Sequence, residues 1–214
     1  MNISQSRKRI LLASPRTTTL PGSIHRRQPS LGLGYVAAVC EQSGFDVAIY
    51  DASLGDQTSP SADANQLICG DADADMAAAI SSFAPHLIGI TIPFSTAVAQ
   101  ASKLAQLARH LLPDCPIIGG GAHVNGVVED FRQSQATDLP SLADGLRQLC
   151  GAGFDYALSG ECDFTFARLA QILLSGREPT NIAGCTPLFD SALPRYIPPN
   201  PAAVDVNQLP LPAR

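Results

Sequence analysis

Five short apolar runs recur along the chain, and most are followed by a loop and then by a segment with helical spacing. These runs cover residues 9–13, 46–51, 85–92, 116–119 and 156–158. Runs that are apolar on both faces are typical of parallel strands buried between two layers of helices. Helices are predicted for residues 31–43, 76–83, 97–112 and 164–174, with a broken helix over 124–149 that is interrupted by Pro140. The pattern therefore predicts an α/β fold, a doubly wound five-stranded parallel sheet with helices on both faces.

The character of the chain changes after Gly176, because eight of its 17 prolines lie at or after Pro179. We predict one domain over residues 1–176 and an extension over 177–214. The extension is expected to hold a short hairpin, with residues 186–189 facing 195–197, and then a Pro-rich linker. Within the domain, residues 52–72 are rich in Ser, Asp, Gly and Pro and are expected to form a loose excursion.

Composition excludes several classes of protein. Hydrophobic residues make up 45% of the chain, enough for a buried core, and the net charge of −5 argues against a nucleic-acid-binding face. The six cysteines lie at least 12 residues apart, so they form no zinc or redox pair and fit a reduced, cytoplasmic protein. No apolar run approaches the roughly 20 residues that a membrane span needs.

The most distinctive stretch is residues 117–123, where an apolar run ends in three glycines and then Ala122 and His123. The glycines fit either a tight strand-to-helix turn or backbone that approaches a ligand closely. Ligands of open parallel sheets bind beyond the carboxyl ends of the strands, where the loops 14–30, 91–96, 119–125 and 159–163 are expected to meet. His123 and Glu161 are the titratable residues of most interest there, and each also fits a plain structural role.

Motifs for common chemistries are missing. The chain has no Gly-x-Ser-x-Gly nucleophile elbow, no Walker phosphate loop and no G-x-G-x-x-G after the first strand. The acidic run 71–75 fails as a calcium loop, because Met76 stands where a glycine is needed and Ser82 where a glutamate is needed. Its acids are expected to stabilise the start of the helix over 76–83.

The order of motifs as a whole resembles a known family. The motifs are Pro-Ser-Leu-Gly-Leu-Gly-Tyr over 29–35, Gly-Phe-Asp-Val over 44–47, Pro-His-Leu-Ile-Gly-Ile-Thr over 85–91, Ile-Gly-Gly-Gly-Ala-His over 118–123, Ser-Gly-Glu-Cys-Asp over 159–163 and Leu-Pro-Leu-Pro-Ala-Arg over 209–214. Their succession resembles the N-terminal cobalamin-binding domain of cobalamin-dependent radical S-adenosylmethionine (SAM) enzymes.

The resemblance implies a Rossmann-like domain that holds the corrin ring over the strand ends and the nucleotide tail of the cofactor beside the sheet. The glycines then let a benzimidazole approach the backbone. Thr91 falls where related domains place a Ser that contacts the tail. The implied cobalamin-binding residues are Pro29, Ser30, Leu31, Thr91, Ile92, Pro93, Ser95, Gly119, Gly120, Gly121, His123, Gly160 and Glu161.

One departure from related cobalamin domains concerns the lower ligand of cobalt. Many of them carry D-x-H-x-x-G before the first helix, with the His bound to cobalt. Counted back from Gly44, the motif's Gly falls on Gly32, its His on Pro29 and its Asp on Arg27. Proline has no donor atom for cobalt, and His25 lacks the surrounding Asp and Gly. We therefore predict cobalamin with its tail detached from cobalt and no histidine in its place.

The resemblance further implies a module for methyl transfer. The radical SAM motif C-x-x-x-C-x-x-C is absent from these 214 residues. S-adenosylmethionine and the 4Fe–4S cluster are therefore expected in a C-terminal radical SAM domain of the same polypeptide. Two other readings stay open: a cofactor-free signalling or interaction domain of flavodoxin-like fold, and a domain that binds a flavin or a nucleotide at the same strand ends.

Overall fold

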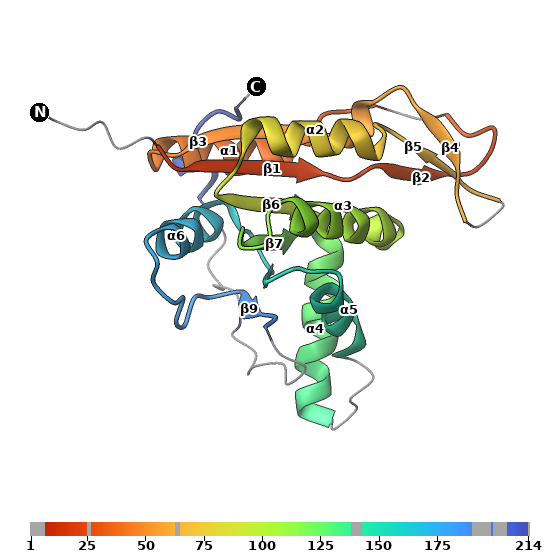
Figure 1. Cartoon of the computed structure of the whole chain (residues 1–214). Coiled ribbons are helices and arrows are strands. Elements are labelled where there is room, and N and C mark those ends of the chain that lie inside the picture. The colour runs from red at the N-terminus through yellow and green to blue at the C-terminus, as the bar shows by residue number, and fades with distance from the viewer. Residues whose placement is uncertain are drawn as a thin grey trace, which may run out of the picture.

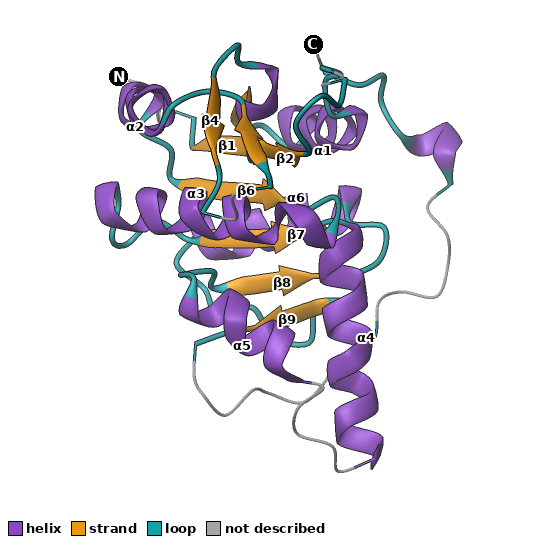
Figure 2. Cartoon of the chain, turned by 90° about the vertical axis from the view of Figure 1, so that its right-hand side faces the viewer, coloured by secondary structure: helices purple, strands orange, loops and turns teal. Residues whose placement is uncertain are grey.

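A computed structural model of the chain describes residues 7–24, 27–62, 65–137, 143–189, 198 and 205–213. Its centre is a six-stranded sheet whose strands lie in the order β3-β1-β6-β7-β8-β9. The strands are β1 (Arg9–Ser14), β3 (Asp46–Asp51), β6 (Leu87–Thr91), β7 (Ile117–Gly120), β8 (Tyr156–Leu158) and β9 (Cys185–Pro187). The first five run parallel, as predicted, and β9 pairs antiparallel with β8 at the edge (Figure 2).

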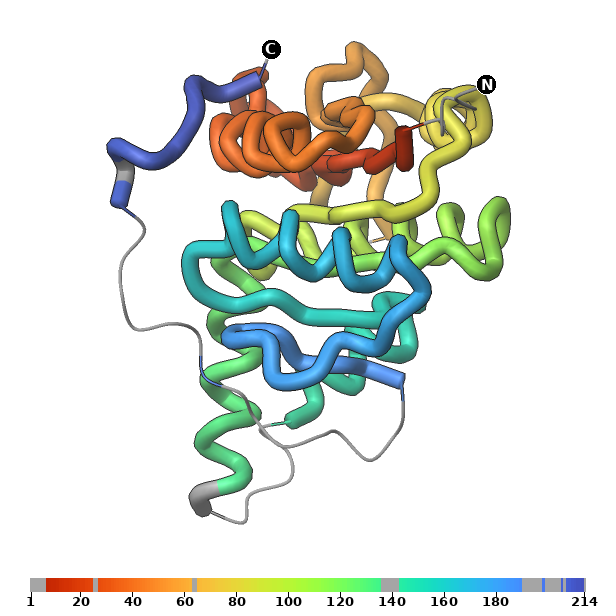
Figure 3. Tube along the Cα trace, turned by 90° about the vertical axis from the view of Figure 1, so that its left-hand side faces the viewer, coloured from red at the N-terminus to blue at the C-terminus, as the bar shows by residue number. Residues whose placement is uncertain are grey.

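Successive side chains of the strands enter two separate cores, because the side chains of a strand point alternately to its two faces. Leu11, Ile88 and Ile117 pack on one face against α2 (Asp73–Phe83), α3 (Val98–Leu111), α4 (Ala122–Thr137) and α5 (Asp144–Gly151). Ile10, Leu12 and Ile118 pack on the other face against α1 (Leu31–Gln42) and α6 (Asp163–Leu174). The helices α1 and α6 contact each other on that face (Figure 3). Burial on both faces explains why the strands read as continuous apolar runs.

The polar segment 52–72 is more ordered than the sequence indicates. After a 3-10 turn over Ala52–Leu54, it forms β4 (Thr58–Pro60) and β5 (Leu67–Cys69), which pair antiparallel with each other. β5 also pairs with β2 (Thr17–Thr19), so that a second, three-stranded sheet extends beyond the carboxyl end of β1 (Figure 1). Strands of three residues are too short to leave a period-two pattern in the sequence, which is why they were not predicted.

Two described parts of the C-terminal extension contact the rest of the domain. Thr186, expected in a hairpin, lies in β9 and pairs with Ala157 of β8. The expected hairpin partner 195–197 lies outside the described residues, so the hairpin stays a prediction. Residues 205–213 return to α1 (Figure 3), where the Ala213 N–H donates to the Gly34 carbonyl at 3.0 Å. A Cβ on Gly34 would lie 3.1 Å from Pro212 Cβ, so this glycine gives the returning segment room. The division at residue 176 stays a prediction.

None of the described helices is long and apolar enough to cross a membrane. The cytoplasmic location stays a prediction.

His86 lies at the amino-terminal ends of the parallel strands, directly before β6. Its Nδ1 accepts the backbone N–H of Arg9 at 3.0 Å, a bond that requires this nitrogen to be unprotonated. Burial, and then the positive charges of Arg9 and Lys8, lower the pKa of His86. The unfolded chain therefore binds more protons at this position than the folded chain does.

We expect the wild-type protein to lose stability relative to His86→Gln as the pH falls from about 7 to 5, below the histidine's unfolded pKa of about 6.5. Glutamine keeps an acceptor for the Arg9 N–H and does not titrate. Urea unfolding at several pH values measures the difference. A difference in the free energy of unfolding that stays constant with pH would contradict this role for His86.

Candidate functional site: a cleft between α1, α6 and the strand ends

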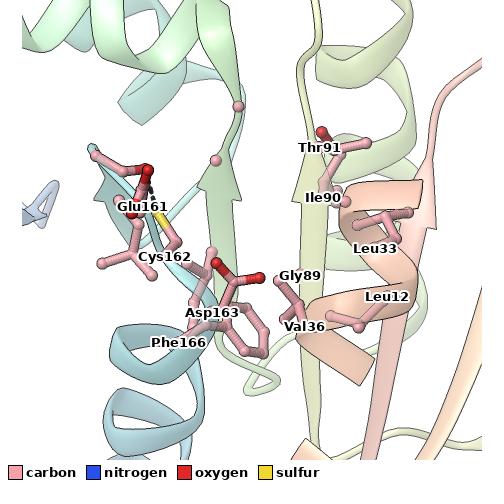
Figure 4. A pocket seen from close by; sticks show the side chains of 16 residues that line it. Leu12, Leu33, Val36, Gly89, Ile90, Thr91, Glu161, Cys162, Asp163 and Phe166 are labelled. Carbon is pink, nitrogen blue, oxygen red and sulfur yellow. Dashed lines mark hydrogen bonds between the residues drawn. The ribbon is translucent and has the colours of Figure 1, made fainter. Parts of the chain in front are cut away.

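A cleft of about 250 Å³ lies between α1 and α6, above the carboxyl ends of the central strands (Figure 4). Its floor is formed by the sheet and the residues that directly follow it: Leu12, Gly89, Ile90, Thr91, Ile118, Gly120, Gly121 and Leu158. Its walls come from α1, with Gly32, Leu33 and Val36, and from the start of α6 and the preceding loop, with Gly160, Glu161, Cys162, Asp163 and Phe166. Most of these residues are apolar or lack a side chain.

The position of the cleft follows from the strand order. β1 lies between β3 and β6, so the chain leaves β1 toward one edge of the sheet and later continues on its other side. Connections that diverge in this way open a crevice at the carboxyl ends of the two central strands. Leu12 of β1 pairs with Gly89 of β6 at this point, and both residues line the cleft.

The three consecutive glycines after Ile118 have three different surroundings. A Cβ on Gly119 would lie 3.1 Å from the ring of Phe154, so this glycine makes room for core packing. Gly121 has a φ of +106°, and a Cβ there would lie 2.8 Å from the carbonyl oxygen of Ile92. A Cβ on Gly120 would have Leu158 O, at 3.9 Å, as its nearest neighbour. Gly119 and Gly121 thus serve the fold, while Gly120 keeps the floor of the cleft open.

The inner end of the cleft is closed by Phe166 of α6. A Cβ on Gly89 would lie 2.7 Å from two atoms of the Phe166 ring and 2.9 Å from Leu12 Cδ2. The ring can lie over β6 only because residue 89 has no side chain. The result is a flat apolar end that suits an aromatic ring system.

The mouth of the cleft is shaped by the loop between β8 and α6. Gly160 has a φ of +88°, a backbone conformation that favours glycine, and its N–H donates to Asn125 Oδ1 of α4 at 2.9 Å. The thiol of Cys162 donates to the Gly160 carbonyl at 3.1 Å, and burial raises its pKa to about 12. Cys162 is therefore a protonated wall residue at neutral pH, and not a nucleophile.

The structure brings five of the predicted site residues to the cleft: Thr91, Gly120, Gly121, Gly160 and Glu161. Two more lie in the fold beneath it, with Gly119 under Phe154 and Ile92 fully buried in the core on the other face. Pro29, Ser30 and Leu31 lead into α1; Ser30 caps the helix by accepting the Leu33 N–H, and Leu31 is 62% exposed. Pro93 precedes the short 3-10 helix that begins at Ser95. The cofactor-binding role of all these residues stays a prediction.

His123 lies outside the cleft lining, at the start of α4. Its Nδ1 is 3.1 Å from Ser95 Oγ, its backbone N–H donates to the Ile92 carbonyl, and its Nε2 is buried without a partner among the described residues. Burial lowers the pKa of His123, with a smaller opposing effect from Asp130. Its backbone and side-chain bonds join the loop after β6 to the loop after β7.

Sequence reasoning missed the cleft residues that lie on the facing sides of the two helices. These are Gly32, Leu33 and Val36 of α1 and Phe166 of α6. Cys162 and Asp163 lie in the loop 159–163 that was expected at the site, but they were not named as binding residues. Leu12, Gly89, Ile90, Ile118 and Leu158 of the strands were also missed. One sequence signal could have indicated these cleft residues. Gly32 lies within a helix and Gly89 within a strand, where a glycine leaves space for a neighbouring group.

Comparison with known protein families gives a match. The B12 binding domain family matches residues 18–145, more than half of the chain. The chain belongs to the B12-binding domain family. The resemblance to cobalamin-binding domains that the sequence motifs indicate is therefore confirmed.

Two curated relatives of this B12-binding domain are named as methyltransferases. The chain is 27% identical over 206 residues to the uncharacterized methyltransferase PH0819 of Pyrococcus horikoshii, covering 96% of this chain and 38% of that protein. It is 32% identical over 119 residues to cytidylyl-2-hydroxyethylphosphonate methyltransferase of Streptomyces wedmorensis, covering 54% of this chain and 22% of that protein. The chain thus spans less than two fifths of the length of these relatives.

Solved structures of the radical S-adenosylmethionine methyltransferase TsrM from Kitasatospora setae share the fold. The form with cobalamin and a [4Fe–4S] cluster bound gives a TM-score of 0.63 at 18% identity, over 97% of this chain and 31% of that one. The form with tryptophan and a SAM analogue bound gives 0.60 at 18% identity, over 89% and 30%. The B12-binding domain described here is therefore similar in fold to part of a larger enzyme.

Gly121→Ala should lower the free energy of unfolding by about 3 kcal/mol, because it adds left-handed backbone strain and a clash with the Ile92 carbonyl. Gly126→Ala in α4 is the matched control. A Cβ there has no neighbour within 4 Å, so the exchange should raise stability by about 0.5 to 1 kcal/mol. Urea unfolding measures both values, and equal effects would refute the distinct role of Gly121.

Asn125→Ala should speed amide hydrogen exchange at Gly160 by about fivefold to tenfold, because the hydrogen bond that holds this N–H is worth about 1 kcal/mol. Asn125→Asp keeps an oxygen acceptor and should preserve the protection. Unchanged exchange in the alanine variant would show that the loop is held by other contacts.

Proposed function

We propose that this chain is the cobalamin-binding module of a cobalamin-dependent radical SAM methyltransferase. The observation that carries the proposal is the open face of Gly120 in an apolar cleft between α1 and α6, in a member of the B12-binding domain family. The names of the curated relatives and the presence of cobalamin in the TsrM structure of similar fold support it.

The residues of the cleft fit the nucleotide tail of cobalamin. Its dimethylbenzimidazole is a flat, largely apolar bicyclic ring, and Leu12, Val36 and Phe166 offer an apolar inner end for it. Gly120 in the floor and Gly32 in the α1 wall have no Cβ to narrow the space. The corrin ring would then lie over the strand ends, where Leu31 and Phe94 are 62% and 70% exposed. Pro29, Ser30, Pro93, Ser95 and His123 are proposed to border the corrin.

The proposed state of the cofactor has its tail detached from cobalt and no histidine below the metal. Pro29 occupies the motif position of the ligating histidine and has no donor atom. His25 lies outside the described residues, and His123 Nδ1 is engaged by Ser95. Burial of the tail between α1 and α6 would keep it away from cobalt.

Cobalamin would supply the capacity to carry and donate a methyl group. The residues of this chain would bind the tail, orient the corrin and exclude water from the cleft. S-adenosylmethionine and the 4Fe–4S cluster would be held by a C-terminal radical SAM domain, which these 214 residues do not contain by sequence motif. Transfer to an unactivated carbon of the substrate is the proposed reaction class.

The charges of the cleft weigh against a flavin or nucleotide site. Its lining contains two carboxyl groups, Glu161 and Asp163, and no lysine or arginine among the described residues. A terminal phosphate dianion would meet like charges there and no cation. A cofactor-free signalling domain, in turn, would gain nothing from an open apolar cleft, because exposed apolar surface favours unwanted association.

Hydroxocobalamin should bind the wild-type protein and change its visible spectrum on titration. Gly120→Leu should weaken binding by at least about tenfold, because the new side chain fills the floor of the cleft, and the urea midpoint should remain close to that of the wild type. A well-folded wild-type protein that shows no binding at about 50 µM cobalamin would refute the proposed function.

Gly126→Leu is the control for the size of the substitution. Gly126 is exposed on α4, and a Cβ at this position would have no neighbouring heavy atom within 4 Å. This variant should bind cobalamin like the wild type. If Gly120→Leu also bound normally, the tail would lie elsewhere than in this cleft.

A further inference from the structure

Asp163 places a carboxyl group inside an otherwise apolar part of the cleft. It is the first residue of α6, and its side chain is half-buried. The carboxyl group lies in the gap between α6 and α1, beside Phe166 and across from Gly89 and Val36 (Figure 4). Cys162, which precedes it, points its thiol at the Gly160 carbonyl.

This carboxyl group lacks a partner from another residue within the described part of the chain. The hydrogen bond that it receives comes from its own backbone N–H. Burial and then the nearby charge of Glu161 raise the pKa of Asp163, and the backbone hydrogen bond opposes them. Placing a polar group among apolar neighbours costs free energy unless a hydrogen bond offsets it. An acidic side chain at the start of a helix also stabilises the helix when its carboxyl group points into solvent. Helix stabilisation therefore does not require the Asp163 carboxyl group to face the cleft.

The detached tail of cobalamin also carries a polar atom that requires a hydrogen-bond partner. Once its base has left cobalt, a ring nitrogen of the benzimidazole is free, and burying it without a partner is unfavourable. The rest of the bicycle is apolar and suits the inner end near Leu12 and Phe166. A carboxyl group and an imidazole-type nitrogen can share one proton, with either group as the donor.

We propose that Asp163 hydrogen-bonds the free ring nitrogen of the cofactor's buried base, and in this way competes with cobalt for that nitrogen. The inference rests on the proposed function and adds to it a residue that holds the tail in the detached state. The other titratable groups of the cleft lining are Glu161 and Cys162. Neither is a cation that would pair with Asp163 and withdraw it from the ligand.

The test compares Asp163→Leu with the wild type on three corrinoids, with affinities measured by equilibrium dialysis. For cobalamin we expect a loss of about tenfold, together with a larger share of bound cofactor whose visible spectrum shows the base on cobalt. Cobinamide lacks the nucleotide tail, and a phenolic cobamide keeps a tail without the ring nitrogen. Both should bind the variant within about twofold of the wild type.

Asp163→Asn is the conservative variant, because its amide N–H can donate to the same nitrogen. It should recover most of the cobalamin affinity and the tail-detached spectrum, and urea unfolding should show that both variants are folded. A similar loss for cobinamide or for the phenolic cobamide would overturn the inference, since Asp163 would then act on another part of the ligand or on the fold. Undiminished cobalamin binding by Asp163→Leu would also overturn it.

The two proposals fail in different ways. A folded wild-type protein that binds none of the three corrinoids removes the proposed function and this inference with it. A wild-type protein that binds cobalamin with the base on cobalt leaves a cobalamin module but overturns the role of Asp163. Binding with the base detached, in both the wild type and Asp163→Leu, would leave the proposed function intact and overturn only the inference.

Discussion

The contact between Phe166 and Gly89 sets how closely α6 approaches the sheet. A methyl group on residue 89 would lie 2.7 Å from the aromatic ring, so α6 can take its position only above a strand with a bare backbone at this point. Phe166 in turn fixes the end of α6 that carries Cys162 and Asp163. The width of the cleft and the chemistry at its mouth thus both depend on one missing side chain in β6. Close-packed interiors transmit such constraints, since neither the ring nor the strand can yield without leaving a void.

The three consecutive glycines 119–121 differ in whether the fold requires them. Gly119 and Gly121 are required by Phe154 and by the Ile92 carbonyl, so their loss would be felt by the fold. Gly120 lies between these two glycines, and neither Phe154 nor the Ile92 carbonyl requires a glycine at this position. A glycine that the fold does not require, in a position that faces a cleft, supports the proposal that a ligand approaches the backbone at Gly120.

The sequence predicted the five parallel strands because strands buried on both faces leave continuous apolar runs, as residues 9–13 and 85–92 do. It also located the strand-end loops, and through them Thr91, Gly120 and Gly160. It did not indicate Val36 or Phe166, because these face each other across the gap between α1 and α6. Which helices share a face depends on the strand order, and that order becomes known only in three dimensions. The three-residue strands of the small sheet were beyond prediction for a simpler reason, since so few residues show no periodicity.

The return of residues 205–213 to α1 has a consequence for the order of folding. Pro212 and Ala213 meet Gly34 across nearly the whole length of the described chain, so this contact has one of the largest sequence separations in the molecule. Contacts between such distant residues carry a high loop-closure entropy and form after local ones. During synthesis, α1 emerges early and stays uncovered at Gly34 until Pro212 and Ala213 appear. One wall of the cleft therefore acquires its outer support only when the rest of the domain has already been built.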